Sequence, residues 1–320
     1  MGSGIWSTDV YDAAARYRKV SGTSAFAYSD SGSRKVHPAL DPRGVTRESR
    51  DCDEHPRSLA IAVLFDVTGS MGHVPRVLQT KLPQLLGLLL RKGYATDPQI
   101  MFGAIGDATC DRVPLQVGQF ESDNRMDEDL GRIVLEGGGG GSMNESYELA
   151  MYFMARHTAI DCYEKRGRRG YLFIIGDEMA YPKVKAREVR DVVGDELEAD
   201  IPLRRIVTEV LRRYDTYHLM PAGAAHAGNP RVRGFWRDLL GQRAIELDDL
   251  DAVAETIALT VGLGEAAVDL DAGLADLDDV GSGARATVSK ALALVGAERG
   301  TVATSALPAL RAGDDNVTRL

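Results

Sequence analysis

The sequence has few of the features that mark disulfide-rich, zinc-binding and membrane-spanning proteins. Its 320 residues include three cysteines, an odd number with no C-x-x-C pair, so neither a disulfide framework nor a zinc cluster is expected. The strongest apolar run, residues 85–90, is far shorter than the roughly 20 residues that a membrane span needs. The chain does not start with a basic stretch followed by an apolar core, so we expect no signal peptide and a reducing, cytoplasmic location.

Basic residues are in the minority. Lys and Arg number 38 against 47 Asp and Glu, which gives a formal net charge of -9. An acidic surface binds nucleic acid and anionic membranes poorly, so neither is an expected partner. Zinc-protease H-E-x-x-H, hydrolase G-x-S-x-G and P-loop G-x-x-x-x-G-K-[ST] patterns are all missing from the sequence.

One stretch in the first half of the chain predicts the centre of the fold. Residues 59–65 are apolar and rich in Val, Ile and Leu, and they are followed by Asp66, Thr68 and Ser70 and then by a leucine-rich segment with helical spacing. This pattern indicates a buried strand, a polar loop and a helix. Ligands bind beyond the carboxyl ends of parallel strands, so the polar loop is a candidate functional site.

Further apolar segments alternate with helical patterns along the chain. The six expected strands are residues 58–66, 99–104, 114–120, 171–175, 216–220 and 244–247. Their spacing predicts an α/β fold with a doubly wound, mainly parallel six-stranded sheet and one antiparallel edge strand. We expect a polar N-terminal extension over residues 1–57, the α/β domain over 58–264, and an Ala/Gly-rich, partly helical C-terminal extension over 265–320. Outside those helices the extensions are expected to be irregular.

Three polar loops are expected at one edge of this sheet. They are the loop from Asp66 to Ser70, the segment 142–145 at a helix start, and Asp177 after a later strand. Carboxylates and hydroxyls without thiols or imidazoles form a set of hard oxygen ligands that suits Mg²⁺, Mn²⁺ or Ca²⁺. The sequence therefore predicts a divalent cation site there.

Residues 66–72, Asp-Val-Thr-Gly-Ser-Met-Gly, resemble the D-x-[S/T]-x-S motif of von Willebrand factor A domains, which opens their metal-ion-dependent adhesion site. The glycine-rich segment 137–142 and Asp177 match the later elements of that site in order, so the resemblance covers roughly residues 58–264. It implies a Rossmann-like fold and a cation site, preferably for Mg²⁺. The ligands it implies are Asp66, Thr68, Ser70, Ser142 and Asp177.

The third ligand loop has an ambiguous register. Five consecutive glycines precede Ser142, so Asn144 or Glu145 are alternatives for its position. Because glycine permits close backbone approach, we interpret the glycine run as packing tightly against the metal loop.

The resemblance implies a protein-interaction module rather than an enzyme. In this reading an Asp or Glu side chain of a partner protein takes the open coordination position of the bound cation. Intracellular bacterial members of the family work beside AAA+ ATPases as scaffolds or adaptors, so an AAA+ ATPase is the partner class that the resemblance suggests.

The same residues also resemble a second family. Asp66 to Ser70 is similar to the D-x-T-G-T loop of P-type ATPases and other haloacid dehalogenase-like phosphotransferases, in which Asp66 would be the nucleophile. Soluble members carry a second acid where Thr68 stands, and the candidates for a phosphate-binding lysine, Lys165 and Lys183, lie in no matching context. The phosphotransferase is therefore the alternative hypothesis.

Overall fold

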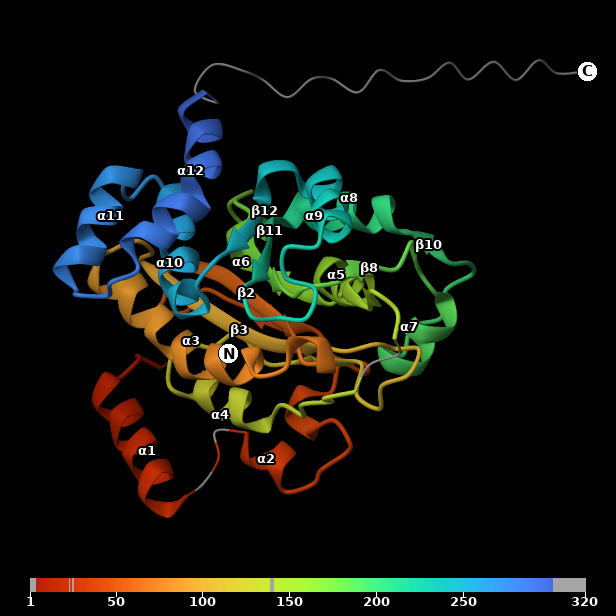
Figure 1. Ribbon diagram of the computed structural model, residues 1–320. Helices are drawn as coiled ribbons and strands as arrows, with labels where there is room; N and C mark the ends of the chain where they lie inside the picture. Colours follow the sequence, from red (N-terminus) through yellow and green to blue (C-terminus); the bar gives the residue numbers. More distant parts are fainter. Residues whose placement is uncertain (1–3, 23, 25, 139–140, 302–320) are drawn as a thin grey trace, which may run out of the picture.

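A computed structural model describes residues 4–22, 24, 26–138 and 141–301 and has a six-stranded sheet at its centre (Figure 1). The order across the sheet is β12-β11-β7-β2-β3-β4, and every pair is parallel except β3 with β4. In chain order the strands are β2 (Ser58–Asp66), β3 (Asp97–Ile105), β4 (Leu115–Val117), β7 (Gly170–Ile175), β11 (Tyr214–Pro221) and β12 (Ala244–Leu247). The predicted α/β class, the six strands and the antiparallel edge strand are confirmed.

Strand β2 lies in the interior of the sheet, between β3 and β7, and all nine of its residues are buried. A parallel strand covered on both faces needs apolar side chains on both, which explains its uninterrupted Val, Ile and Leu content. The strand ends at Asp66, and the polar loop that follows leaves the apolar core.

Helices cover the sheet on two sides. In Figure 1, α3 and α10 lie together on one side of the strands, and α5 and α8 lie together on the other. Within the described residues, seven α-helices lie between β2 and β12 in the sequence, and an eighth follows β12. In chain order they are α3 (Val74–Arg91), α4 (Arg125–Arg132), α5 (Tyr147–Arg156), α6 (Asp161–Glu164), α7 (Ala186–Val192), α8 (Leu203–Arg213), α9 (Pro230–Leu240) and α10 (Val253–Gly264). Glycine disfavours a helix interior, yet Gly131 lies within α4, so it does not interrupt this helix.

Several short elements lie outside the main sheet. Two-stranded pairs form between β1 (Arg47–Ser49) and β6 (Thr158–Ile160), β5 (Asn144–Glu145) and β8 (Met179–Ala180), and β9 (Lys183–Val184) and β10 (Ile201–Pro202). Single 3-10 turns are η1 (Pro38–Leu40), η2 (Gly69–Met71), η3 (Gly241–Arg243) and η4 (Leu250–Ala252). Of these, η2 and the β5–β8 pair position the candidate site.

The N-terminal extension is more regular than expected. It contains α1 (Thr8–Ser21) and α2 (Ala27–Asp30), so the expectation of irregular structure is wrong there. The Ser7 hydroxyl accepts a hydrogen bond from the Val10 N–H and Gly22 ends α1 with a φ of 66°, so capping groups define the helix at both ends. Its apolar pattern is weak because much of its surface is solvent-exposed: Tyr17 is 71% exposed.

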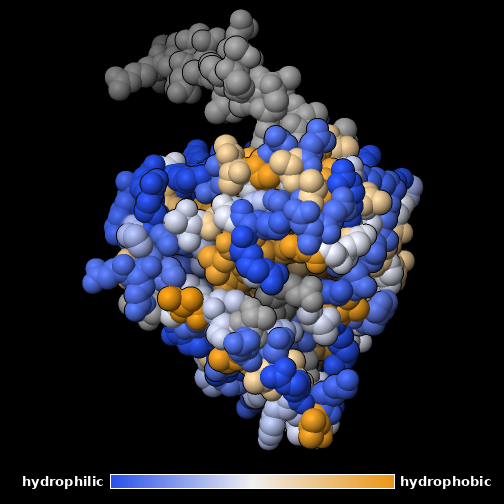
Figure 2. Space-filling model, turned by 90° about the vertical axis from the view of Figure 1, so that its left-hand side faces the viewer, coloured by the Kyte–Doolittle hydropathy of each residue, from blue (hydrophilic) through white to orange (hydrophobic). Residues whose placement is uncertain are grey.

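The C-terminal extension contains two helices, in agreement with the expectation that it is partly helical. They are α11 (Leu270–Asp279) and α12 (Arg285–Thr301), and residues 302–320 lie outside the described part of the chain. The face of the molecule that carries α1 and α11 is mainly hydrophilic, with small separate apolar patches (Figure 2). None of the described helices combines the length and apolar character that a membrane crossing requires.

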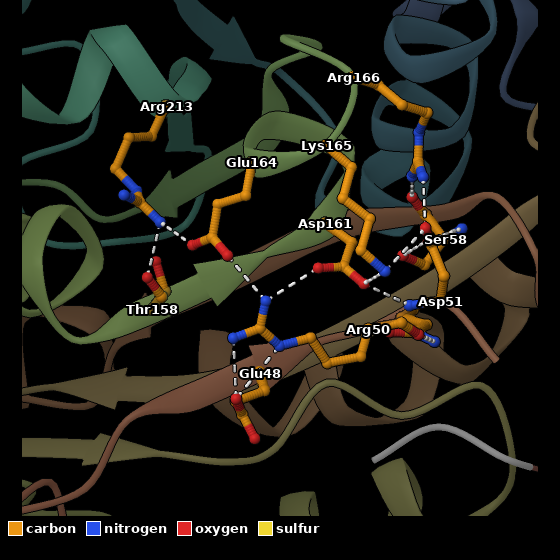
Figure 3. Close-up of polar contacts among 11 residues, drawn as sticks. Glu48, Arg50, Asp51, Ser58, Thr158, Asp161, Glu164, Lys165, Arg166 and Arg213 are labelled. Carbon is orange, nitrogen blue, oxygen red and sulfur yellow. Dashed lines mark hydrogen bonds and ion pairs between the residues drawn. The ribbon is translucent and has the colours of Figure 1, made fainter.

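An ion-pair network attaches the N-terminal extension to the sheet. The Arg50 guanidinium lies between carboxylates of β1 and α6, with Nη1 2.8 Å from Asp161 Oδ1 and 2.7 Å from Glu164 Oε2 (Figure 3). Asp51 accepts a 3.0 Å hydrogen bond from the Ser58 N–H and pairs with Arg166 at 2.6 Å. The network holds the start of β2, at the opposite end of that strand from Asp66.

Candidate metal centre

The loop after β2 folds around the carboxylate of Asp66. Asp66 Oδ1 accepts hydrogen bonds from the Thr68 N–H at 2.8 Å and from Thr68 Oγ1 at 2.7 Å. This turn is one that aspartate favours, because its side chain pairs with the backbone two residues on. The following turn, η2, brings Ser70 Oγ to 3.3 Å from Thr68 Oγ1.

Asp177 reaches the same loop from the end of β7. Its Oδ1 accepts a 2.7 Å hydrogen bond from Ser70 Oγ, and its Oδ2 accepts a 2.7 Å bond from the His226 N–H. Strands β2 and β7 are parallel neighbours, so their carboxyl ends lie side by side. The structure thus brings together four predicted ligands, Asp66, Thr68, Ser70 and Asp177, while their binding of a cation stays a prediction.

The glycine run packs directly against this loop. The Gly137 N–H donates to the Val67 carbonyl at 3.2 Å, and the Gly69 N–H donates to the Gly138 carbonyl. A Cβ at Gly69 would lie 2.8 Å from the Gly138 oxygen, too close for any side chain. For its described members, the run therefore makes the close backbone approach expected from sequence; Gly139 and Gly140 lie outside the described residues.

The third loop presents Glu145 to Asp66. Ser142 is exposed, and its hydroxyl donates to the Asn144 carbonyl at 3.2 Å, while the Asn144 amide donates to the Ala180 carbonyl at 3.0 Å. Glu145 is buried, with a carboxylate oxygen within 4.8 Å of oxygens of Asp66 and Glu178. Among the three alternatives for this loop, Glu145 is the one that the fold places beside Asp66.

Two residues of the centre escaped the sequence analysis. The helical spacing of Tyr147 with Met151 and Met154 predicts an apolar core position, yet its hydroxyl donates a 2.8 Å hydrogen bond to Asp66 Oδ2. Gly176 leaves the space for this ring, since a Cβ there would overlap the Tyr147 hydroxyl. Glu178 directly follows the predicted ligand Asp177, and this adjacency is the only signal that the sequence offers for it.

A second turn of the same type lies beside the first. At the end of β3, Asp107 Oδ1 accepts from the Thr109 N–H at 2.8 Å and from Thr109 Oγ1 at 2.7 Å. The other oxygen of Asp107 accepts a 3.0 Å bond from the Tyr181 hydroxyl. Thr109 therefore has the same local geometry as Thr68 and lies outside the predicted ligand set, so Thr109→Ala is a control for removing a hydroxyl from the predicted site.

Burial and mutual repulsion perturb the acids of the centre. Burial raises the pKa of Asp66 to about 7, and the charge of Asp177 adds to this rise, although hydrogen bonds from Thr68 and Tyr147 oppose it. Burial, followed by the charge of Asp66, raises the pKa of Glu145, and burial likewise raises the pKa of Glu178. A bound cation would favour the ionised forms of all three.

The oxygen ligands that the centre offers suit a divalent cation. Within the described part of the chain, Glu145 Oε2 and Glu178 Oε2 are buried and receive no hydrogen bond from another residue, and the two carboxyl groups can hydrogen-bond to each other when one of them is protonated. A buried carboxylate oxygen without a donor is unfavourable, and a hard cation satisfies it through direct ligation. The burial of these two glutamate oxygens therefore supports a cation at the centre, in addition to the chemical type of the ligands.

A cavity of about 470 Å³ lies over the centre. Its lining includes Thr68, Ser70, Ser142, Glu145, Glu178 and His226. His226, whose side chain is 30% exposed, places Nε2 3.2 Å from Glu178 Oε1. The cavity gives an incoming group of a partner a route to the acids and hydroxyls.

Comparisons with solved structures give distant likenesses. No protein-family model and no curated protein matches the chain. Two structures of the pilus adhesin SpaC from Lactobacillus rhamnosus GG align with TM-scores of 0.43 and 0.45 at 10% and 9% identity, covering 70% and 69% of this chain. Proximal thread matrix protein 1 from the mussel byssus aligns with a TM-score of 0.44 at 9% identity, over 67% of this chain. The chain spans 31% of the adhesin and 49% of the thread protein, and likenesses this distant assign neither a family nor a function.

Proposed function

We propose that this chain is a metal-dependent protein-interaction module of the von Willebrand factor A type, with a doubly wound, Rossmann-like sheet. A divalent cation is held at Asp66, Thr68, Ser70 and Asp177, and an Asp or Glu side chain of a partner protein completes its coordination. The third loop contributes through Ser142 if it moves toward the ion, whereas the buried carboxylate of Glu145 lies beside Asp66 together with Glu178. The module acts without catalysing a reaction.

The arrangement of the two hydroxyls carries this proposal. Thr68 Oγ1 donates its proton to Asp66, and Ser70 Oγ donates its proton to Asp177, so both oxygens keep their lone pairs free. The two oxygens are 3.3 Å apart. Adjacent ligands of an octahedral ion at about 2.1 Å are separated by about 3 Å, so this spacing suits Mg²⁺ or Mn²⁺ after a small adjustment.

Neutral hydroxyl ligands leave most of the cation's charge available. When bound, the ion supplies electrostatic attraction for a carboxylate, and the shape of the surrounding loops supplies selectivity. The chain's own contribution is to orient the hydroxyls through Asp66 and Asp177. Mg²⁺ is preferred over Mn²⁺ and Ca²⁺ on cellular abundance, and an AAA+ ATPase is the proposed partner class.

The phosphotransferase alternative receives less support from the geometry. Both oxygens of Asp66 accept hydrogen bonds, from Thr68 and Tyr147, and the side chain is fully buried. Lys165 pairs with Asp161 and Lys183 with Asp200, so neither lysine is directed at Asp66. A nucleophilic carboxylate needs an accessible oxygen and a positive group for the phosphate.

Affinity purification with the full chain tests the proposal. Proteins captured from an extract in Mg²⁺ are expected to be lost in excess EDTA, and Ser70→Ala is expected to lose the same proteins in Mg²⁺. Thr109→Ala, the matched turn on β3, should capture them like the unaltered chain. Capture that persists in EDTA contradicts the metal bridge, and turnover of a phosphate ester abolished by Asp66→Asn supports the alternative.

A further inference from the structure

A second group of acids lies beside the predicted ligands. Asp66, Glu145 and Glu178 each place one carboxylate oxygen within 4.8 Å of the others, and all three side chains are buried. We propose that this group is a second divalent cation subsite, which shares Asp66 with the site formed by Thr68, Ser70 and Asp177.

The backbone fixes the two glutamates of this subsite. Strands β5 and β8 pair in parallel, with Glu145 opposite Ala180, so the segment that carries Glu178 runs beside the one that carries Glu145. The Trp236 indole N–H also donates a 2.8 Å hydrogen bond to the Glu178 carbonyl. The two carboxylates are thus brought together by paired backbone rather than by freely rotating surface side chains.

Buried carboxylate oxygens favour a cation at this group. Glu145 and Glu178 are 2% and 4% exposed and line the cavity over Asp66. Among the described residues, the Oε2 atom of each receives no hydrogen bond from a third residue, so that only a proton shared between the two carboxyl groups, or a cation in its place, relieves their repulsion. His226 reaches only the other oxygen of Glu178, at 3.2 Å. Like-charged side chains this close, with oxygens left unpaired, are what a cation between them would stabilise.

The oxygen spacing agrees with a shared ion. Oxygens that bind one Mg²⁺ or Ca²⁺ at about 2.1 to 2.6 Å lie roughly 3 to 5 Å from one another, which includes the 4.8 Å limit of this group. Side-chain oxygens of Thr68, Ser70 and Asp177 remain available to the first ion. Neighbouring cation sites bridged by one carboxylate are a common arrangement where two ions are bound.

A second ion would affect the binding of a partner through the charge of the acids, and this step rests on the proposed function. Asp66, Glu145, Asp177 and Glu178 carry four negative charges when ionised, so one divalent ion leaves two of them uncompensated. That residual charge repels an incoming carboxylate. A second ion removes it, so occupancy of the second subsite would determine how strongly a partner's Asp or Glu binds.

Manganese titration of the full, EDTA-stripped chain at pH 8 tests the subsite. Free Mn²⁺, followed by its electron paramagnetic resonance signal, is expected to show two bound ions per chain. Glu145→Gln combined with Glu178→Gln should leave one ion, and the second dissociation constant should rise at least tenfold in Glu178→Gln alone. Glu255→Gln is the matched control because Glu255 is also buried, at 6% exposure, with an unpartnered Oε2. It should keep both ions.

The outcomes separate this proposal from the proposed function. A single bound ion in the unaltered chain, or two ions that persist in the folded Glu145→Gln, Glu178→Gln variant, overturns the second subsite. Circular dichroism reports whether the double variant is folded, and Glu178→Gln alone decides the question if it is not. Two ions together with EDTA-resistant partner capture would support the subsite while contradicting the metal bridge, and one ion with EDTA-sensitive capture would do the reverse.

Discussion

Ser70 donates a 2.7 Å hydrogen bond from Oγ to Oδ1 of Asp177, a residue 107 positions away in the sequence. The bond joins the loops after β2 and β7, which are neighbouring parallel strands. It directs the hydroxyl proton toward the carboxylate and leaves the oxygen lone pairs free. In the proposed cation site, this bond orients the Ser70 hydroxyl as a ligand.

Replacing Ser70 by alanine removes that ligand and leaves Asp177 with the His226 N–H as its remaining donor. We expect Ser70→Ala to weaken Mg²⁺ or Mn²⁺ binding at least about tenfold. Isothermal titration calorimetry measures the change, and Thr109→Ala should bind the cation with unaltered affinity. Equal affinity of Ser70→Ala and the unaltered chain would contradict the role of Ser70.

Cation binding should stabilise the fold more at high pH than at low pH. The pKa of Asp66 is raised from an ordinary 3.8 to about 7, chiefly by burial. In EDTA the protonated acid therefore contributes stability that is complete below about pH 4 and lost as the pH rises through about 7. Above pH 7 a cation replaces the lost proton, whereas at pH 5 protons compete with it.

Differential scanning calorimetry with Mg²⁺ and with EDTA measures this effect. The increase in Tm on adding Mg²⁺ should be larger at pH 8 than at pH 5. An increase of the same size at both values would show that protons and the cation do not compete for these acids.

His218 should make the protein less stable in acid. Its ring is fully buried against Trp236, with the centroids 3.7 Å apart, and burial lowers its pKa from an ordinary 6.5 to about 3. Because the unfolded chain takes up this proton first, stability is complete above about pH 6.5 and falls as the pH drops toward 3. One such group contributes a slope of up to about 1.4 kcal/mol per pH unit.

Urea unfolding between pH 6 and 4 tests the contribution of His218. His218→Phe keeps an aromatic ring against Trp236 and loses the titration, so its free energy of unfolding should vary less with pH. A slope equal to that of the unaltered chain would assign the acid sensitivity to other groups.

Arg50 should stabilise the attachment of the N-terminal extension. Asp161 is almost fully buried and pairs with both Arg50 and Lys165. Arg50→Ala is expected to lower the free energy of unfolding by about 1 to 3 kcal/mol, since it removes charged hydrogen bonds while Lys165 still pairs with Asp161. Urea titration measures the loss, and limited proteolysis should cut the chain near β1 sooner.

Arg187 provides the control for Arg50. It forms a 3.5 Å ion pair with Asp191 and is 84% exposed, so Arg187→Ala should change stability by well under about 1 kcal/mol. Equal effects of the two substitutions would mean that the network in Figure 3 adds no more than a surface pair.

The sheet and the polar loop after β2 were predictable from the sequence. Apolar strand patterns alternating with helical ones predicted the six strands and the reversed edge strand, because residue periodicity follows directly from burial. Asp66, Thr68 and Ser70 were predictable as a group, since neighbours within one loop after a buried strand share a location. Asp177 followed because parallel strands end at the same edge.

The residue of the third loop that approaches Asp66 could not be predicted from local patterns. Glu145 is positioned by the pairing of β5 with β8, a contact between short segments that no local pattern marks. The sequence pattern around Tyr147 is that of a buried core aromatic. The hydrogen bond from its hydroxyl to Asp66 depends on the space left by Gly176. Helix α1 was missed because its caps, rather than a strong apolar stripe, define it. Contacts between distant segments depend on packing geometry, and periodicity in one segment does not encode them.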